Sequence, residues 1–231
     1  MMNAALTDKV MKYFSPEEIV DDKSREAVIK SCERLYMLFS RSRKIAVHTK
    51  LGGTFRAYHT YSRHQLTLYI TAPSLTTLSS ESVTRALIVD TVMEARSRYY
   101  FASLVLLTIA FILLTNFIVP SPMLLTAFLI VGLGLLAASY LITKRAPKHT
   151  VIQRIEEVHR ELVVTSSRYR YVSSRLQSIV SDVLKVVKDI ALRRRDRGYI
   201  VVGGCGLYEF RSQRREDNVF DIDMWRVSGE V

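Results

Sequence analysis

Hydrophobic and polar residues follow two different spacings along this chain, and the spacing predicts helices in some segments and strands in others. Between residues 15 and 40 the apolar positions recur every three or four residues, as on one side of a helix. Those positions are Val28, Cys32, Leu35 and Phe39. Ser15 and Pro16 suit the cap and the first turn of such a helix. We therefore predict an amphipathic helix that packs against a partner.

Two other regions alternate apolar and polar residues with a period of two, which predicts strands. The first region holds KIAVHTK at 44–50, FRAYHTY at 55–61 and LTLYIT at 66–71, with a Gly-Gly break after the first run. The second holds YIVVGGCGLYEF at 199–210 and VFDIDMW at 219–225. We predict a small antiparallel sheet from the first region and a terminal hairpin from the second.

A third segment, residues 101–143, contains no charged residue at all. It holds two apolar stretches, 101–119 and 123–142, each close to the ~20 residues that cross a bilayer as a helix. Basic residues flank its outer ends and are absent from the proline-containing connection, so the positive-inside rule places both termini in the cytoplasm. We predict a multi-pass protein of the cell membrane with a two-helix transmembrane hairpin.

The borders of this segment fit a membrane interface, where tyrosine and basic side chains anchor a helix. The predicted anchors are Arg96, Arg98, Tyr99, Tyr100, Tyr140, Lys144 and Arg145. Inside the segment, Gly134 and Ala138 are small residues four positions apart, a spacing that suits close packing of two helices.

The stretch from residue 155 to residue 190 places apolar residues at alternating steps of three and four, over about five heptads. This pattern predicts a long helix or coiled coil. Two shorter helices that bend near residues 165–167 and pack in the same domain fit equally well, because periods of 3.5 and 3.6 differ little over this length. The predicted oligomer face consists of Leu162, Val172, Leu176, Ile179, Val183 and Val186.

These elements divide the chain into four segments. Residues 1–98 form an N-terminal cytoplasmic α/β segment, 99–143 the transmembrane hairpin, 144–197 a cytoplasmic long helix or coiled coil, and 198–231 a C-terminal β-hairpin. The predicted fold class is an α+β membrane protein, mostly α. Its cytoplasmic domain would combine amphipathic helices with small antiparallel β-hairpins.

The formal net charge is +11, from 33 basic and 22 acidic residues. Basic residues on both sides of the apolar segment suit a surface near anionic lipid headgroups. The runs RYRY at 168–171 and ALRRRDRG at 191–198 are basic, but no nucleic-acid-binding fold is recognisable around them. We expect the lipid bilayer and a protein partner or second copy as partners, and no nucleic acid.

Short motifs exclude several kinds of site. GGCG at 203–206 lacks the Lys and the Ser or Thr of a phosphate-binding loop. Asp217, Asp221 and Asp223 do not follow the spacing of a calcium loop, and the solvent face of a strand is the better interpretation. His59 and His64 are five positions apart, so a regular strand points them to opposite faces. We expect no metal and no cofactor.

The order of the predicted elements resembles that of a known enzyme family. A helix, a glycine-containing hairpin, LYITAPSLTTLSSESVTRAL at 68–87, a helix, two apolar spans and a further helix resemble the membrane zinc metallopeptidases of the HtpX-like and CAAX-protease type, over roughly residues 15–192. That family uses H-E-x-x-H, in which two histidines bind zinc and the glutamate activates water, and a further glutamate ligand after the spans. The resemblance implies that the first motif falls on residues 89–93 and the second on 157–161.

Both zinc histidines are absent from these positions. Val89 and Met93 replace them, and neither side chain is a suitable zinc ligand. The resemblance implies that Asp90 takes the place of the catalytic base and Glu157 that of the third ligand, with Glu161 at the end of the second motif. It therefore implies a degenerate, non-catalytic member of the family.

The leading hypothesis is a non-catalytic integral membrane protein whose cytoplasmic domain binds or scaffolds other proteins. One alternative is a divergent membrane metallopeptidase that uses Asp90, Glu157 and His159 at a different metal site. Another is an oligomeric membrane assembly factor held together by the predicted coiled coil. The sequence names no partner, substrate or pathway.

Overall fold

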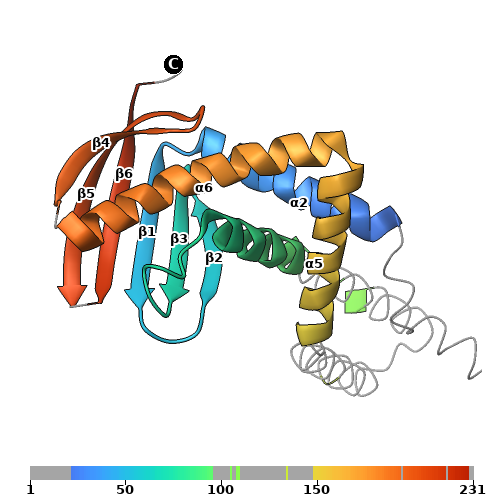
Figure 1. Ribbon diagram of the computed structural model, residues 1–231. Helices are drawn as coiled ribbons and strands as arrows, with labels where there is room; N and C mark the ends of the chain where they lie inside the picture. Colours follow the sequence, from blue (N-terminus) through green and yellow to red (C-terminus); the bar gives the residue numbers. More distant parts are fainter. Residues whose placement is uncertain are drawn as a thin grey trace, which may run out of the picture. The chain divides into compact units, whose positions relative to one another are not determined.

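A computed structural model describes residues 22–95, 148–193, 195–216 and 218–228, together with the single positions 105, 108, 109 and 134 (Figure 1). The chain divides into two compact units. One unit combines Met1–Val92 with Arg154–Val231, and the other is Met93–Gln153. The helices and strands that position the candidate site belong to the first unit.

A six-stranded mixed sheet organises the first unit, in the order β2-β3-β1-β6-β5-β4. Its strands are β1 (Lys44–Leu51), β2 (Arg56–Ser62), β3 (Gln65–Ala72), β4 (Arg197–Val202), β5 (Gly206–Glu216) and β6 (Val219–Ser228). β1 pairs parallel with β3 and antiparallel with β6. Strands from the two ends of the chain thus share one sheet.

The predicted pair of small antiparallel hairpins is therefore replaced by one mixed sheet. The run predicted as a single strand at 199–210 is two strands, β4 and β5, separated by a turn in which the N–H of Cys205 bonds to the carbonyl of Val202. β5 continues through the polar residues 211–216, which lie between the two predicted strand segments. Alternation identifies strand segments but not which strands pair, because pairing depends on contacts between distant residues.

Helices cover one face of this sheet. α2 (Asp22–Arg41) packs against α6 (Ser167–Arg193), which crosses the strands in Figure 1. Helical residues 80–92 lie on the same side, near β2 and β3. The predicted apolar positions of α2 are all buried: Val28, Cys32, Leu35 and Phe39. On the sheet, buried aliphatic residues of β1 and β3 alternate along each strand and meet these helices.

The apolar pattern at 155–190 belongs to two helices, α5 (Lys148–Thr165) and α6, with Ser166 between them. The Ser166 hydroxyl accepts a hydrogen bond from the backbone N–H of Tyr169, which caps the start of α6. The hypothesis of two shorter helices is confirmed, and the single long helix is wrong.

The side of α5 and α6 that was predicted to be an oligomer face is occupied within the chain. Leu162, Leu176, Ile179, Val183 and Val186 are each no more than 3% exposed, and Val172 is half-buried. A helical period indicates that one side packs against something, but it does not tell a sheet of the same chain from a second copy. This side is therefore not available to a second copy.

The prediction of a multi-pass membrane fold is contradicted. Within the described part of the chain, no helix is both long and apolar enough to cross a bilayer. The predicted spans 101–119 and 123–142 lie outside the described residues except at four positions. An apolar run meets the length criterion whatever it packs against, so length alone does not establish a span. The fold class is corrected to an α+β fold around a mixed sheet, and the cell-membrane location is withdrawn with the membrane fold.

The residues predicted to anchor or pack the spans are almost all outside the described residues. This holds for Arg96, Arg98, Tyr99, Tyr100, Tyr140, Lys144, Arg145 and Ala138. Gly134 is described only as an exposed helical position, and a Cβ added there would meet nothing within 4 Å. The structure gives no support for a close helix contact at Gly134.

Candidate binding surface

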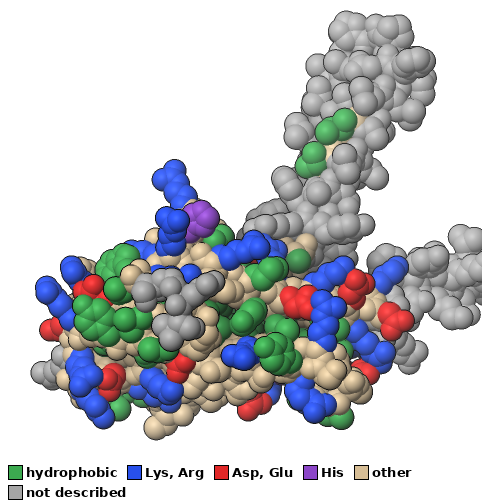
Figure 2. All heavy atoms as spheres, turned by 90° about the horizontal axis from the view of Figure 1, so that it is seen from above, with side chains coloured by type: hydrophobic (Ala, Val, Ile, Leu, Met, Phe, Trp, Pro, Cys, Tyr) green, Lys and Arg blue, Asp and Glu red, His purple; other side chains and the backbone are tan. Residues whose placement is uncertain are grey.

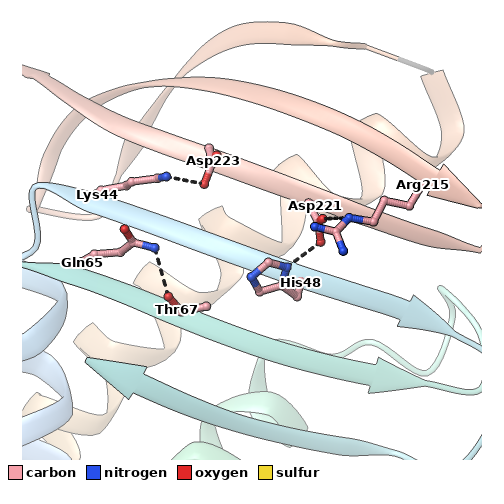
Figure 3. A network of polar contacts seen from close by, with 7 residues as sticks. All are labelled: Lys44, His48, Gln65, Thr67, Arg215, Asp221 and Asp223. Carbon is pink, nitrogen blue, oxygen red and sulfur yellow. Dashed lines mark hydrogen bonds and ion pairs between the residues drawn. The ribbon is translucent and has the colours of Figure 1, made fainter. Parts of the chain in front are cut away.

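The face of the sheet opposite the helices carries the most distinctive arrangement of side chains in the first unit. On β1, Ile45 and Val47 face the helices, whereas Lys44 and His48 point the other way. Figure 3 looks onto this second side, with α6 behind the strands. We call it the open face. It consists of the side chains of all six strands that point away from the helices.

Three aromatic rings form a ladder across the open face. Tyr58 on β2 lies opposite Tyr69 on β3, and Tyr69 lies beside His48 on β1. The ring centroids are 4.7 Å apart for the two tyrosines and 4.9 Å apart for Tyr69 and His48, with interplanar angles of 10° and 21°. Both faces of the Tyr69 ring are therefore covered by its neighbours, and the outer face of Tyr58 ends the ladder.

The ladder continues into a charged pair on the neighbouring strand. The ring nitrogen Nδ1 of His48 lies 2.5 Å from Oδ1 of Asp221, its cross-strand partner on β6 (Figure 3). The other carboxylate oxygen of Asp221 forms an ion pair with Arg215. A β-bulge between Arg214 and Glu216 shifts the register here, which turns Arg215 toward Asp221. One carboxylate thus holds a histidine and an arginine together.

Trp225 on β6 forms a second cluster of aromatic and charged side chains on the open face. Lys44 Nζ lies 5.2 Å and the Arg211 guanidinium 5.8 Å from its ring centroid, within the range of cation–π contacts. Lys44 also pairs with Asp223 at 2.9 Å. The indole is more than one third exposed. Cations thus flank the ring while leaving part of it accessible.

Basic side chains outnumber acidic ones on the open face. The basic residues are Lys44, Lys50, Arg56, Arg197, Arg211 and Arg215, and the acidic ones are Glu209, Glu216, Asp221 and Asp223. Lys50 and Arg56 flank the aromatic ladder, both exposed and without an ion-pair partner among the described residues. Figure 2 shows Lys and Arg side chains spread over the described surface with hydrophobic side chains between them. The face therefore suits an acidic partner with some apolar area.

The residues at the metallopeptidase-like positions do not come together. Oδ2 of Asp90 accepts hydrogen bonds from the backbone N–H of His59 at 3.0 Å and from its ring at 2.9 Å. Glu161 on α5 instead pairs with Arg25 on α2 at 2.5 Å. Glu157 is exposed, and Val89 and Met93 are half-buried. Asp90 and Glu161 therefore have different partners and do not share one site.

His159 also has a structural partner. Its ring lies 2.6 Å from the Tyr169 hydroxyl, and the two rings meet edge to face. Burial lowers the pKa of His159, and the nearby Arg85 lowers it further. Within the described residues, no three histidine, cysteine or acidic side chains lie close enough to hold a metal ion. The alternative site of Asp90, Glu157 and His159 is not assembled.

The cysteines offer no nucleophile. Cys32 and Cys205 are both free and buried. Burial raises the pKa of the Cys32 thiol to about 12, and burial also raises the pKa of Cys205. Because the thiolate is the reactive form, both groups behave as packing residues.

Sequence reasoning missed every residue of the ladder and of the charged pair. The alternation of FRAYHTY and LTLYIT could have placed Tyr58 and Tyr69 on the polar side of their strands. The pairing of His48 with Asp221, 173 positions later, leaves no signal in one sequence. No known protein family, curated protein or solved structure matches this chain.

Proposed function

We propose that this protein acts by binding an acidic protein partner through its open face, without catalysing a reaction. The observation that carries the proposal is a six-stranded sheet face that no helix of the described residues covers, with exposed aromatic rings and an excess of basic side chains. Exposed aromatic and arginine side chains are the types enriched in protein interfaces. This proposal keeps the binding or scaffolding role expected from the sequence and leaves out the membrane.

The spacing of the rings argues against a single-stranded nucleic acid as the partner. Such proteins present open ring faces on which bases stack. Here Tyr69 is already stacked on both sides, by Tyr58 and by His48. The cations beside Trp225 likewise use part of its ring surface. A protein surface needs only the ring edges and the basic side chains, which are exposed.

A peptidase activity has little support from these residues. Asp90 would be the base in the metallopeptidase interpretation, but it is engaged by buried His59. Glu161 is engaged by Arg25. The surroundings of these residues favour a non-catalytic protein over a divergent metallopeptidase.

Site-specific photocrosslinking in the protein's own cells tests the proposal. A benzoylphenylalanine replaces Tyr58 or Trp225 on the open face, and Met37 or Tyr171 on exposed helix surfaces as matched controls. We expect discrete protein adducts from the two open-face positions only. The double variant K50E/R56E should abolish the adduct from position 58, because it reverses the charge beside the ladder.

Two outcomes would contradict the proposal. Adducts of equal yield from the helix positions would show that the open face is not selective. Adducts that contain nucleic acid in place of protein would establish the other class of partner.

A further inference from the structure

The two edges of the sheet differ in how their backbone groups are used. At the β2 edge, the carboxylate of Asp90 accepts the outward N–H of His59, so a helix residue occupies the middle of this edge. Among the strands of the described residues, β4 forms the other edge and pairs with β5 alone. Unpaired strand edges are templates for pairing with another chain. β4 is therefore the edge at which pairing with another chain is expected.

The outward backbone groups of β4 follow from one hydrogen bond. The N–H of Ser212 bonds to the carbonyl of Asp196, so residue 196 faces β5. Because the direction alternates along a strand, the N–H and C=O groups of Arg197, Tyr199 and Val201 point away from β5. The side chains of Tyr199 and Val201 are 66% and 57% exposed. Within the part of the chain that the structure describes, β4 thus combines backbone groups that no other strand binds with exposed apolar area.

We propose that two copies of this chain pair antiparallel through β4, around a two-fold axis at Ile200. In this register Tyr199 lies opposite the partner's Val201, and Val201 lies opposite the partner's Tyr199. The two most exposed apolar side chains of the strand therefore cover each other. These residues carry the outward backbone groups, and the pairs exchange hydrogen bonds across the axis. Arg197 lies opposite the partner's Gly203, so no two arginines face each other.

The charges along α6 fit the same axis. The N–H of Gly203, just after β4, donates to Asp182 on α6, and α6 ends at Arg193 shortly before β4 begins. The second half of α6 therefore runs antiparallel to β4. From Gly203 to Ile200 is roughly 10 Å of strand, or roughly six to seven helical residues, which brings α6 to about residue 188 beside the axis.

On one side of this half-helix acidic and basic residues alternate. They are Asp182, Lys185, Asp189 and Arg193, and within the chain Lys185 pairs with Asp182 at 2.7 Å and Arg193 with Asp189 at 3.3 Å. A partner would add contacts to these exposed pairs. A two-fold axis near residue 188 reverses this order in the partner, so Asp182 faces the partner's Arg193 and Lys185 the partner's Asp189. Strand and helix are therefore self-complementary around one axis, which is the requirement for an isologous dimer. The inference does not depend on what the open face binds.

Sedimentation equilibrium of the full chain over a wide concentration range tests the dimer. We expect a reversible monomer–dimer equilibrium that strengthens with added salt, because two copies each of net charge +11 repel at long range. Val201→Asp should weaken dimerisation by about tenfold or more, because it places a carboxylate against the partner's Tyr199 twice. Val164→Asp, at an exposed valine of α5, is the matched control and should leave the equilibrium unchanged.

A charge swap separates this arrangement from any other dimer. Lys185→Asp alone puts two carboxylates opposite each other and should weaken the dimer, and the double variant K185D/D189K should restore it. A monomeric wild type, a dimer that survives Val201→Asp, or a swap that fails to restore association would each overturn the proposal. A monomer that instead binds an extended peptide along β4 would also overturn the proposal.

Discussion

The two faces of the sheet are made by the same strands but are built from different interactions. Toward the helices, Leu66, Leu68 and Ile70 of β3 are essentially inaccessible to solvent. Toward the open face, Tyr69 of the same strand stacks on two rings at the surface. Burial of aliphatic area supplies most of the stabilisation of a fold. Among the described residues, the open face therefore depends less on aliphatic burial than the face covered by helices.

We expect the largest change in stability at the centre of the sheet face that the helices cover. Leu68→Ala should lower the free energy of unfolding by about 3 kcal/mol, because it removes a fully buried side chain and leaves a cavity. Thr71→Ala, three positions along on the open face, should change it by less than about 0.5 kcal/mol. Urea denaturation of both variants measures the difference. Equal losses would mean that the open face is covered too.

A smaller loss is expected where the helix layer meets the sheet edge. Asp90→Ala should cost about 2 kcal/mol, because it removes two hydrogen bonds from His59, whose side chain is 2% exposed. The control Glu81→Ala breaks an exposed pair with Arg85 and should cost no more than about 0.5 kcal/mol. If Asp90 were instead a catalytic base, its removal would abolish a peptidase activity and spare stability.

On the open face, the ladder itself should contribute little to stability. Tyr69→Leu should cost about 1 kcal/mol, because it keeps apolar volume and loses two stacked ring pairs. Tyr171→Leu on α6, an exposed tyrosine outside the ladder, should stay within about 0.5 kcal/mol of wild type. Thermal denaturation checks both. A loss as large as that of Leu68→Ala would assign the ladder to the core.

The smallest effect is a pH dependence within the helix layer. The pKa of His159 is lowered in the folded state, first by burial and then by Arg85, whereas Glu81 and Glu156 raise it. The unfolded chain therefore binds the proton more tightly. Stability from this group is complete above the unfolded value of about 6.5 and is lost as the pH falls below it.

The variant His159→Gln isolates this contribution, since glutamine can still bond to the Tyr169 hydroxyl. Unfolding free energies measured on either side of that pH should fall less steeply toward acid for the variant than for wild type. A parallel pair of profiles would mean that His159 titrates alike in both states.

Local patterns were sufficient for several elements. The stripe of Cys32 and Leu35 predicted the buried side of α2, and alternation predicted β1, β2 and β3 within one or two residues. Such patterns report which side of an element is buried, because helices and strands repeat with fixed periods. They do not report what covers that side, so the stripe on α6 fitted a coiled coil and two helices of one domain equally well, and the structure shows that it packs within the chain.

The sequence by itself determined the position of most helices and strands, the basic charge, and the absence of zinc histidines at Val89 and Met93. Only the tertiary structure decided that β1 lies between β3 and β6, and this placement brings His48 to Asp221. The physical reason is that spacing is a local property of the chain. Strand pairing and the surface it builds depend on contacts between residues far apart in sequence.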